Sequence, residues 1–297
     1  MKIIQVHNYY QLVGGEDSVV ADELALLKSN GHELVTCYKH NKILDSGRWT
    51  LFKASIQTIW NWELFREFRM LLQREKPDVV HCHNTFPLIS PSIYWACAKE
   101  GIPVVQTLHN YRLLCLNAFL FRETKLGDKS ISRGEICEKC LTKNFKYPGI
   151  NYGCYRNSRA GSLIVALMLL FHKLIGTWRN KVSAYIALTD FHKQKLIEGG
   201  LPSDKIWVKP NFIQRSENCG QRTVEEDQPT SNSPKQGTDS LLKKDNDEGV
   251  VPSQTPYCLF VGRLSLEKGC DVLLKAWTEF QREWKVGHDN DKIPHLI

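Results

Sequence analysis

The chain has 297 residues, of which 42% are hydrophobic, 10% aromatic and 24% charged. This is the composition of a globular protein and excludes disorder along the whole length. Lysine and arginine number 39 against 32 aspartates and glutamates, which gives a formal net charge of +7. A mildly basic chain suits an anionic partner, such as a phosphorylated ligand, a nucleic acid or an acidic membrane, and does not choose among them.

The first residues do not have the pattern of a secretion signal. The opening Met1-Lys2-Ile3-Ile4-Gln5-Val6-His7 breaks its apolar run too early for a signal-peptide core. The longest apolar run, residues 163–171, is well short of the roughly 20 residues that span a bilayer. Ten cysteines without an export signal should be reduced, so clusters among them favour metal binding or packing over disulfides. We expect a cytoplasmic protein without a transmembrane helix.

Strand-like and helical segments alternate through residues 1–213. Apolar residues at three- and four-residue steps, ending at Gly31, predict a helix over 16–30. We expect the strands at 2–6, 33–37, 77–81, 103–108, 184–188 and 206–209, and further helices at 90–101, 162–176 and 190–198. Short Val- and Ile-rich strands separated by helices predict an α/β fold with a parallel sheet covered on both faces.

Residues 214–256 differ in kind from the rest. They are rich in Ser, Thr, Asn, Gln, Pro and charge and cannot bury enough apolar surface to offset the entropy of ordering, so we predict a disordered linker. A strand at 257–262 and a helix over 268–284 follow, and residues 293–297 resemble the opening of another strand. A fold rarely ends inside its core, so we expect residues 257–297 to be the incomplete start of a second domain.

Gly14 and Gly15 follow the first strand and begin a helix. Glycines there let backbone N–H groups approach a phosphate or a sugar, and the helix dipole favours negative charge at that end. A tight turn that needs a positive φ would also use glycine. The position after the first strand of an α/β sheet adds weight to the ligand interpretation, because ligands bind at the carboxyl ends of such strands.

Polar side chains follow two further predicted strands. His81, His83 and Asn84 come at the end of one, and His109 and Asn110 at the end of the next. Histidine at a strand end can hydrogen-bond a sugar hydroxyl or act as an acid or base near neutral pH. Each alone is more often a structural hydrogen-bonding group, but three histidines at one sheet edge make a binding site an equally good interpretation.

Arg263 and Lys268 stand on either side of a short loop after the strand at 257–262. Two cations in such a loop can hold a diphosphate, where Arg offers a planar fork and Lys a point charge. An exposed basic loop is the alternative for this spacing.

Five segments together resemble the family 4 (group 1) retaining glycosyltransferases of the GT-B architecture. The string from Leu259 to Trp277, with Phe-Val-Gly-Arg-Leu, Glu-Lys-Gly and Leu-Leu-Lys-Ala, looks like the start of that family's donor domain. The other segments are the Gly14-Gly15 loop, Val80-His81-Cys82-His83, Thr107-Leu108-His109-Asn110, and Val208-Lys209-Pro210-Asn211-Phe212-Ile213. They occur in the family's order over nearly all of 1–213 and 257–297.

The resemblance implies two Rossmann-like domains that face one another. Residues 1–213 would be the N-terminal domain, which holds the acceptor, and 257–297 the beginning of the domain that binds the nucleotide-sugar. A hexose-type sugar would pass from a nucleotide-diphosphate-sugar to a saccharide or lipid-linked acceptor with retention, in surface polysaccharide or glycoconjugate synthesis. The family needs no metal or other cofactor for this reaction.

The resemblance also implies roles for single residues. Arg263 and Lys268 would hold the donor diphosphate and stabilise the leaving nucleotide as charge develops. Gly14 and Gly15 would line the cleft opposite them and contact the donor. The acceptor-side cleft would be lined by His81, His83, Asn84 and Asn110. His109 would act by the transferred sugar, accepting a hydrogen bond from a hydroxyl or supporting the oxocarbenium-like state.

Two departures from the family pattern bear on activity. Asn110 stands where many relatives carry Asp, so any role of that carboxylate is lost. The second-domain Glu-x7-Glu pair that grips the donor is absent. The spacing recurs at Glu67 and Glu75, in a first-domain helix, and at Glu217 and Glu225, in the linker, and we treat both as chance. A truncated, non-catalytic chain that keeps the acceptor domain as a binding module is therefore the competing hypothesis.

Four cysteines lie in a loop-rich insertion over residues 115–160. Cys137 and Cys140 form a Cys-x-x-Cys pair, and Cys115 and Cys154 flank it. The close pair offers two thiolates to one tetrahedral Zn²⁺, and the more distant cysteines could close a structural site. Small buried residues or a redox pair are the alternatives. We expect no nucleic-acid partner, because no basic cluster is interleaved with the Cys-x-x-Cys.

Two segments have the composition of membrane-surface helices. Residues 48–74 combine aromatic and basic side chains and could lie on an anionic membrane, where lipid-linked acceptors are found. Packing of the apolar residues into the core is the simpler interpretation, and we favour it for this segment and for residues 163–171. Peripheral contact at the inner face of the membrane remains the second interpretation.

Overall fold

The computed structural model describes residues 1–9, 14–40, 55–125, 132–212, 257–258, 260, 268–287 and 295–296. The chain divides into two compact units, Met1–Gln214 and Arg215–Ile297. The predicted linker at 214–256 and Arg263 lie outside the described residues. None of the helices in the described part of the chain is long and apolar enough to cross a membrane.

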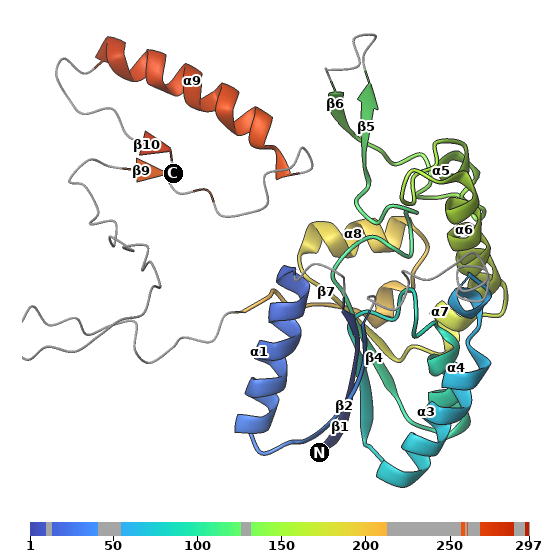
Figure 1. Ribbon diagram of the computed structural model, residues 1–297. Helices are drawn as coiled ribbons and strands as arrows, with labels where there is room; N and C mark the ends of the chain where they lie inside the picture. The colour runs from blue at the N-terminus through green and yellow to red at the C-terminus, as the bar shows by residue number, and fades with distance from the viewer. Residues whose placement is uncertain are drawn as a thin grey trace, which may run out of the picture. The chain divides into compact units, whose positions relative to one another are not determined.

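A six-stranded parallel sheet forms the first unit (Figure 1). Its strands lie in the order β2-β1-β3-β4-β7-β8, which is a Rossmann-like arrangement. Their bounds are β1 (Lys2–Tyr9), β2 (Glu33–His40), β3 (Val79–Cys82), β4 (Val104–Leu108), β7 (Ala184–Ala187) and β8 (Ile206–Val208). The expected α/β class and the Rossmann-like first domain are confirmed.

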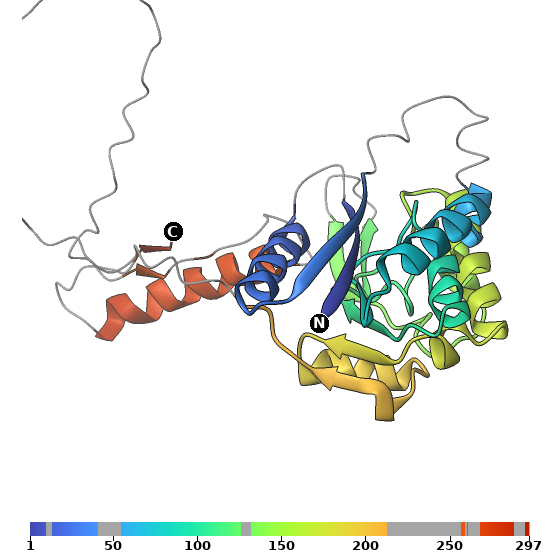
Figure 2. The same cartoon turned by 90° about the horizontal axis from the view of Figure 1, so that it is seen from below.

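Helices cover both faces of this sheet. Figures 1 and 2 show α1 (Gly15–Ser29) on one face and α3 (Trp62–Glu75) with α4 (Ser92–Lys99) on the other. Central strands are therefore buried on both sides, and the six middle residues of β1 are all buried. The remaining helices of this unit are α5 (Tyr147–Asn151), α6 (Arg159–Leu174), α7 (Thr177–Asn180) and α8 (Asp190–Glu198).

The apolar side of α3 packs into the core of the first unit. Its Leu64, Phe65, Phe68 and Leu72 belong to the main hydrophobic core, together with residues of α4. A side-chain cap from Asn61, which accepts from the Leu64 N–H at 3.0 Å, begins the helix. The core-packing interpretation is confirmed for the described part of the 48–74 segment.

The cysteine-bearing insertion has more regular structure than its sequence indicates. An antiparallel hairpin of β5 (Phe121–Lys125) and β6 (Ser132–Ile136) precedes α5. A second hydrophobic cluster lies under it, made by Leu116 with Val165, Ala166, Met168 and Leu169 of α6. The insertion is thus anchored by apolar packing, which the sequence analysis did not anticipate.

The second unit contains the strand, helix and strand expected from the sequence. β9 (Tyr257–Cys258) pairs in parallel with β10 (His295–Leu296), and α9 (Cys270–Gly287) connects them. A parallel pair joined by a helix is the repeating unit of a Rossmann-like sheet.

Candidate functional site

The strand order creates a switch point between β1 and β3. The chain leaves β1 toward β2 on one side and later continues to β4 on the other, and ligands of such sheets bind in the crevice at the carboxyl ends of the two strands. His7 lies near the end of β1, His83 follows β3, and His109 follows β4. The fold therefore brings three histidines from distant parts of the sequence to one edge.

Three residues expected at the acceptor-side cleft and the expected catalytic residue line one pocket at this edge. They are His83, Asn84, His109 and Asn110. The other lining residues are Thr85, Phe86, Tyr94, Gln106, Leu108, Arg112, Leu113, Trp178 and Tyr185. His81 is not among them and belongs to β3 itself. The pocket combines aromatic surface with a few amide and imidazole groups, as small-molecule sites commonly do.

A chain of hydrogen bonds connects the pocket to a buried carboxylate. His109 Nε2 lies 3.0 Å from His83 Nδ1, and His83 Nε2 lies 3.1 Å from Oε2 of Glu23 on α1. The other oxygen of Glu23 accepts from Lys209 Nζ at 2.8 Å. Burial raises the pKa of Glu23, but the hydrogen bond from His83 and the nearby cations outweigh it and hold that pKa well below the usual range. Glu23 is therefore a buried carboxylate.

This network assigns the protons of both rings. A carboxylate facing an unprotonated ring nitrogen would be repulsive, so His83 donates from Nε2 to Glu23. Gln5 Nε2 is also 3.2 Å from His83 Nε2, but its amide donates to the Val20 carbonyl. His83 Nδ1 is then an acceptor, and His109 donates to it from Nε2. The remaining nitrogen of His109, Nδ1, is an acceptor at the pocket.

Burial keeps His109 uncharged. It lowers the pKa of His109 to about 3, with the neighbouring His83 acting in the same direction. Burial also lowers the pKa of His81 to about 3. The contact of 3.8 Å between His81 Nδ1 and Glu23 is therefore not an ion pair at neutral pH. His81 Nε2 lies 2.8 Å from Thr107 Oγ1, so its role is to connect β3 to β4 below the pocket.

The first turn of α1 is held by a second histidine–carboxylate pair. His7 Nε2 donates to Asp17 Oδ1 at 2.8 Å, and Asp17 Oδ2 accepts from the Gly14 N–H at 2.9 Å. Burial lowers the pKa of His7, and Asp17 opposes that shift. The helix N-terminus thus carries its own acidic cap.

Gly14 and Gly15 have no conformational reason to be glycine. Gly14 has φ −128° and ψ 173°, an extended conformation open to any residue, and Gly15 is helical. The interpretation that Gly14 makes a positive-φ turn is therefore wrong. A Cβ at either position would have no described atom within 4 Å. Space beside the first turn of α1 is what these two glycines preserve.

The two asparagines hold the loops around the pocket. Asn84 donates to the Asn8 carbonyl at 2.9 Å and accepts from the Phe86 N–H at 3.0 Å. Asn110 accepts from the Arg112 N–H at 3.0 Å, and the Arg112 guanidinium stands 4.7 Å from the centre of the Phe86 ring. Asn84 and Asn110 fix the backbone that presents His83, His109 and Arg112.

The two cations expected on the donor side belong to the second unit. Lys268 is exposed just before α9 in the second unit. Arg263 is outside the described residues, so its role stays a prediction.

One buried group has metal-binding geometry. Among the described residues, Glu23, His81 and His83 place their ligand atoms within 4.8 Å of one another. Lys209 already supplies a cation to this carboxylate at 2.8 Å. We therefore interpret the group as a buried charge network.

Sequence reasoning missed Glu23, Asp17, His7 and Lys209 as partners of the site. The signal for Glu23 was present, because it falls between Val20 and Leu24 on the apolar side of α1, where an unpaired charge would be costly. A carboxylate at such a position needs a buried partner.

Comparison with known families gives one decisive match, covering the pocket's histidines. Residues 13–140 match the model of Glycosyltransferase Family 4. The resemblance to that family is confirmed for this segment, which contains α1, Glu23, His83 and His109. No curated protein sequence matches the chain.

Several solved structures share part of the fold. UDP-GlcNAc 2-epimerase from Methanocaldococcus jannaschii is 15% identical, with a TM-score of 0.36, and the match covers 70% of this chain and 45% of that one. The Neisseria meningitidis enzyme bound to UDP-GlcNAc is 14% identical, with a TM-score of 0.36, and the match covers 71% of this chain and 47% of that one. The lipopolysaccharide outer core galactosyltransferase WaaB, in its apo form, is 12% identical, with a TM-score of 0.36. That match covers 73% of this chain and 47% of the galactosyltransferase. The chain spans less than half the length of these proteins.

Proposed function

We propose that this chain is a retaining glycosyltransferase. It would transfer a hexose-type sugar from a nucleotide-diphosphate-sugar to a saccharide or lipid-linked acceptor, in surface polysaccharide or glycoconjugate synthesis. The observation that carries the proposal is the hydrogen-bonded pair of His83 and His109 in a pocket at the sheet's switch point, within the segment that matches the family.

The chemistry asked of this pocket is modest. In the transfer, the bond from the sugar's anomeric carbon to the diphosphate breaks and a bond to the acceptor oxygen forms on the same face. The acceptor hydroxyl passes its proton to the leaving diphosphate oxygen. His109 is neutral and presents Nδ1 as an acceptor, so it suits a hydrogen bond from a hydroxyl of the transferred sugar. Such a bond holds the sugar in place while positive charge develops at the anomeric carbon.

The donor diphosphate would be held by two basic residues of the second unit. Arg263 and Lys268 supply two cations for the diphosphate, which removes the need for a bound metal. Gly14 and Gly15 leave room beside the first turn of α1. Because Glu16 and Asp17 make that turn acidic, we assign this space to the sugar portion of the donor and not to its phosphates.

A lipid-linked acceptor would bring the chain to a membrane surface. On α6, Leu163, Leu167, Phe171 and Leu174 recur at three- and four-residue steps and are all exposed, Leu174 at 76%. The exposed cations Arg159 and Lys173 lie on the same helix. An apolar stripe with flanking cations favours peripheral contact with an anionic bilayer, as at the inner face of a cell membrane.

Nucleotide release tests the proposal directly. The purified chain is incubated with a panel of nucleotide-diphosphate-sugars, with and without saccharide and lipid-linked acceptors, and free nucleotide and glycosylated product are measured. Turnover of one donor that depends on an acceptor supports it. Acceptor binding without turnover of any donor would overturn it and identify the chain as a non-catalytic binding module.

A further inference from the structure

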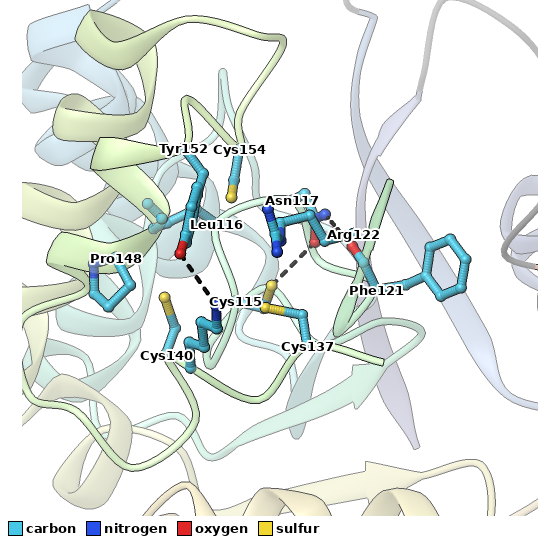
Figure 3. A pocket seen from close by; sticks show the side chains of 12 residues that line it. Cys115, Leu116, Asn117, Phe121, Arg122, Cys137, Cys140, Pro148, Tyr152 and Cys154 are labelled. Atoms are coloured by element: carbon cyan, nitrogen blue, oxygen red, sulfur yellow. Dashed lines mark hydrogen bonds between the residues drawn. The ribbon is translucent and has the colours of Figure 1, made fainter. Parts of the chain in front are cut away.

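The four cysteines of the insertion line a single pocket. Cys115, Cys137, Cys140 and Cys154 all contribute to it, and Figure 3 shows their sulfur atoms turned toward a common space. They come from separate loops: Cys115 follows β4, Cys137 and Cys140 follow β6, and Cys154 follows α5. Thirty-nine residues separate the first from the last in the sequence, so their convergence is a property of the fold.

Backbone hydrogen bonds hold each loop in this arrangement. The Cys115 N–H donates to Tyr111 at 2.8 Å, the Cys137 N–H to Leu120 at 2.8 Å, and the Cys154 N–H to Gly149 at 2.9 Å. Leu141 N–H donates to the Glu138 carbonyl at 2.9 Å and closes the turn between the paired cysteines. The loops are therefore ordered by their own backbone, and the thiols are presented together.

All four cysteines are free thiols. Their sulfur atoms are farther apart than the ligand atoms of Glu23, His81 and His83, which all lie within 4.8 Å of one another. No three of the four sulfurs meet that distance. A tetrahedral Zn²⁺ has Zn–S bonds of about 2.3 Å, so binding would draw the four loops inward. Cys115 Sγ meanwhile donates to Asn117 Oδ1 at 3.0 Å, a weak bond that a metal would replace.

Arg122 and Lys139 line this pocket, and a third cation, Lys146, lies beside Cys140. Lys146 is buried, at 5% exposure, and donates to the carbonyls of Cys140 at 2.7 Å and Leu141 at 3.3 Å. Arg122 lines the pocket, pairs with Glu135 through Nη2, and its buried Nε–H has no hydrogen-bond partner among the described residues. A buried lysine and an unsatisfied guanidinium N–H both indicate that an anionic acceptor belongs here.

We propose that Cys115, Cys137, Cys140 and Cys154 bind one Zn²⁺ ion as a structural site. Each thiol would lose its proton and form one bond to the metal. Four thiolates and Zn²⁺ carry a net charge of −2, which Lys146 and Arg122 would balance. A disulfide or a redox pair at Cys137 and Cys140 would not explain why Cys115 and Cys154 line the same pocket.

The zinc site would stabilise one wall of the pocket that contains His83 and His109. The loop between β4 and Cys115 carries His109, Asn110 and Arg112, which line that pocket. Fixing Cys115 to the hairpin and to α5 through a metal would restrict this loop. The zinc proposal does not depend on glycosyl transfer, since its readouts are metal content and stability.

Metal analysis of the full chain tests the proposal. The protein is purified from zinc-supplemented cells, passed through gel filtration and analysed by mass spectrometry for bound metal. We expect about one zinc per chain. Replacing zinc with Co²⁺ should give the intense sulfur-to-cobalt absorption and visible bands of a tetrahedral thiolate site.

Variants separate this site from the other cysteines. The double variant Cys137→Ser, Cys140→Ser should lose the metal, while the matched control Cys258→Ser, at an exposed cysteine of the second unit, should keep it. Arg122→Gln should keep the ligands but weaken zinc binding by about tenfold. If the double variant does not fold, the wild-type chain still tests the proposal. Added zinc must raise its melting temperature, and a chelator must lower it.

Three results would overturn the proposal. The first is that the purified chain contains no stoichiometric metal and does not take up Co²⁺. The second is a melting temperature that neither zinc nor a chelator changes. The third is a protein mass that is lower by two hydrogens for each disulfide formed. Retention of full metal content by the double variant would place the metal elsewhere and overturn it as well.

Discussion

His109 donates from Nε2 to Nδ1 of His83 across 3.0 Å, and the two rings stack with their centres 5.3 Å apart. The pair joins the loop after β3 to the loop after β4, so its geometry depends on the register between those strands. Behind it, Glu23 fixes the proton of His83. The acceptor nitrogen that His109 presents to the pocket is thus determined by a carboxylate on another element.

Replacing His109 should impair transfer without unfolding the chain. In His109→Ala, the pocket loses the Nδ1 acceptor, and we expect the rate of product formation to fall by about 100-fold or more. The matched control is His32→Gln, which lies at the amino-terminal edge of the sheet, before β2. Initial rates and melting temperatures of both variants are compared with the wild type. An unchanged rate in His109→Ala would remove this residue from the mechanism.

Glu23→Gln keeps the shape of the side chain and removes its charge. His83 then loses its charged acceptor and Lys209 its ionic partner, and we expect the free energy of unfolding to fall by about 1–3 kcal/mol. Because the folded state lowers the pKa of Glu23, the unfolded chain binds this proton first as the pH falls. The stabilisation is therefore complete above the ordinary carboxyl pKa and is lost below it.

Denaturant unfolding between neutral pH and pH 3 measures this effect. The difference in unfolding free energy between wild type and Glu23→Gln should shrink as the pH drops. Glu67→Gln, at an exposed position of α3, is the control and should leave the pH dependence unchanged. A constant difference over the whole range would mean that the charge of Glu23 contributes nothing.

His172 should make the chain sensitive to mild acid. It is fully buried, with Nε2 donating to the Ile59 carbonyl at 2.8 Å and Nδ1 accepting from Thr177 Oγ1 at 2.9 Å. Burial lowers its pKa to about 4 from an ordinary value of 6.5. The unfolded chain takes up the proton first, so stability is complete above pH 6.5 and declines as the pH falls toward 4, by up to roughly 3 kcal/mol.

The slope of unfolding free energy against pH tests this account. His172→Gln should be less stable at pH 7, because it replaces a well-packed ring, but its slope between pH 6.5 and 4 should be smaller than that of the wild type. An identical slope in both proteins would show that other groups cause the acid sensitivity.

Local patterns were enough to predict the sheet and the edge at which the histidines gather. Strand ends follow from hydrophobic runs, and parallel strands present their carboxyl ends at one edge, so His83 and His109 could be expected as neighbours. The different positions of His81 and His83 could not. Both belong to one short segment, yet only His83 lines the pocket, whereas His81 Nε2 lies 2.8 Å from Thr107 Oγ1 of β4.

The partners of the site depend on tertiary contacts that no sequence spacing encodes. Glu23 meets Lys209 across 186 positions of the chain. The convergence of four cysteines likewise depends on the hairpin and α5, since the sequence contains only one close pair. In both cases, the residue types were visible in the sequence, and the fold supplied their proximity.

The exposed stripe of α6 should mediate binding to anionic vesicles. Its buried side, with Val165, Met168 and Leu169, packs into the insertion's cluster, so only the opposite side is available to lipid. Leu167→Asp, at a position that is 40% exposed, adds a negative charge to the stripe and should weaken binding to vesicles of phosphatidylglycerol by about tenfold in a sedimentation assay. Trp207→Asp is the matched control, because Trp207 is 66% exposed on β8 and outside the stripe. Equal vesicle binding by the wild type and Leu167→Asp would show that the stripe does not contact lipid, whereas equal loss in both variants would indicate a non-specific effect of the added charge.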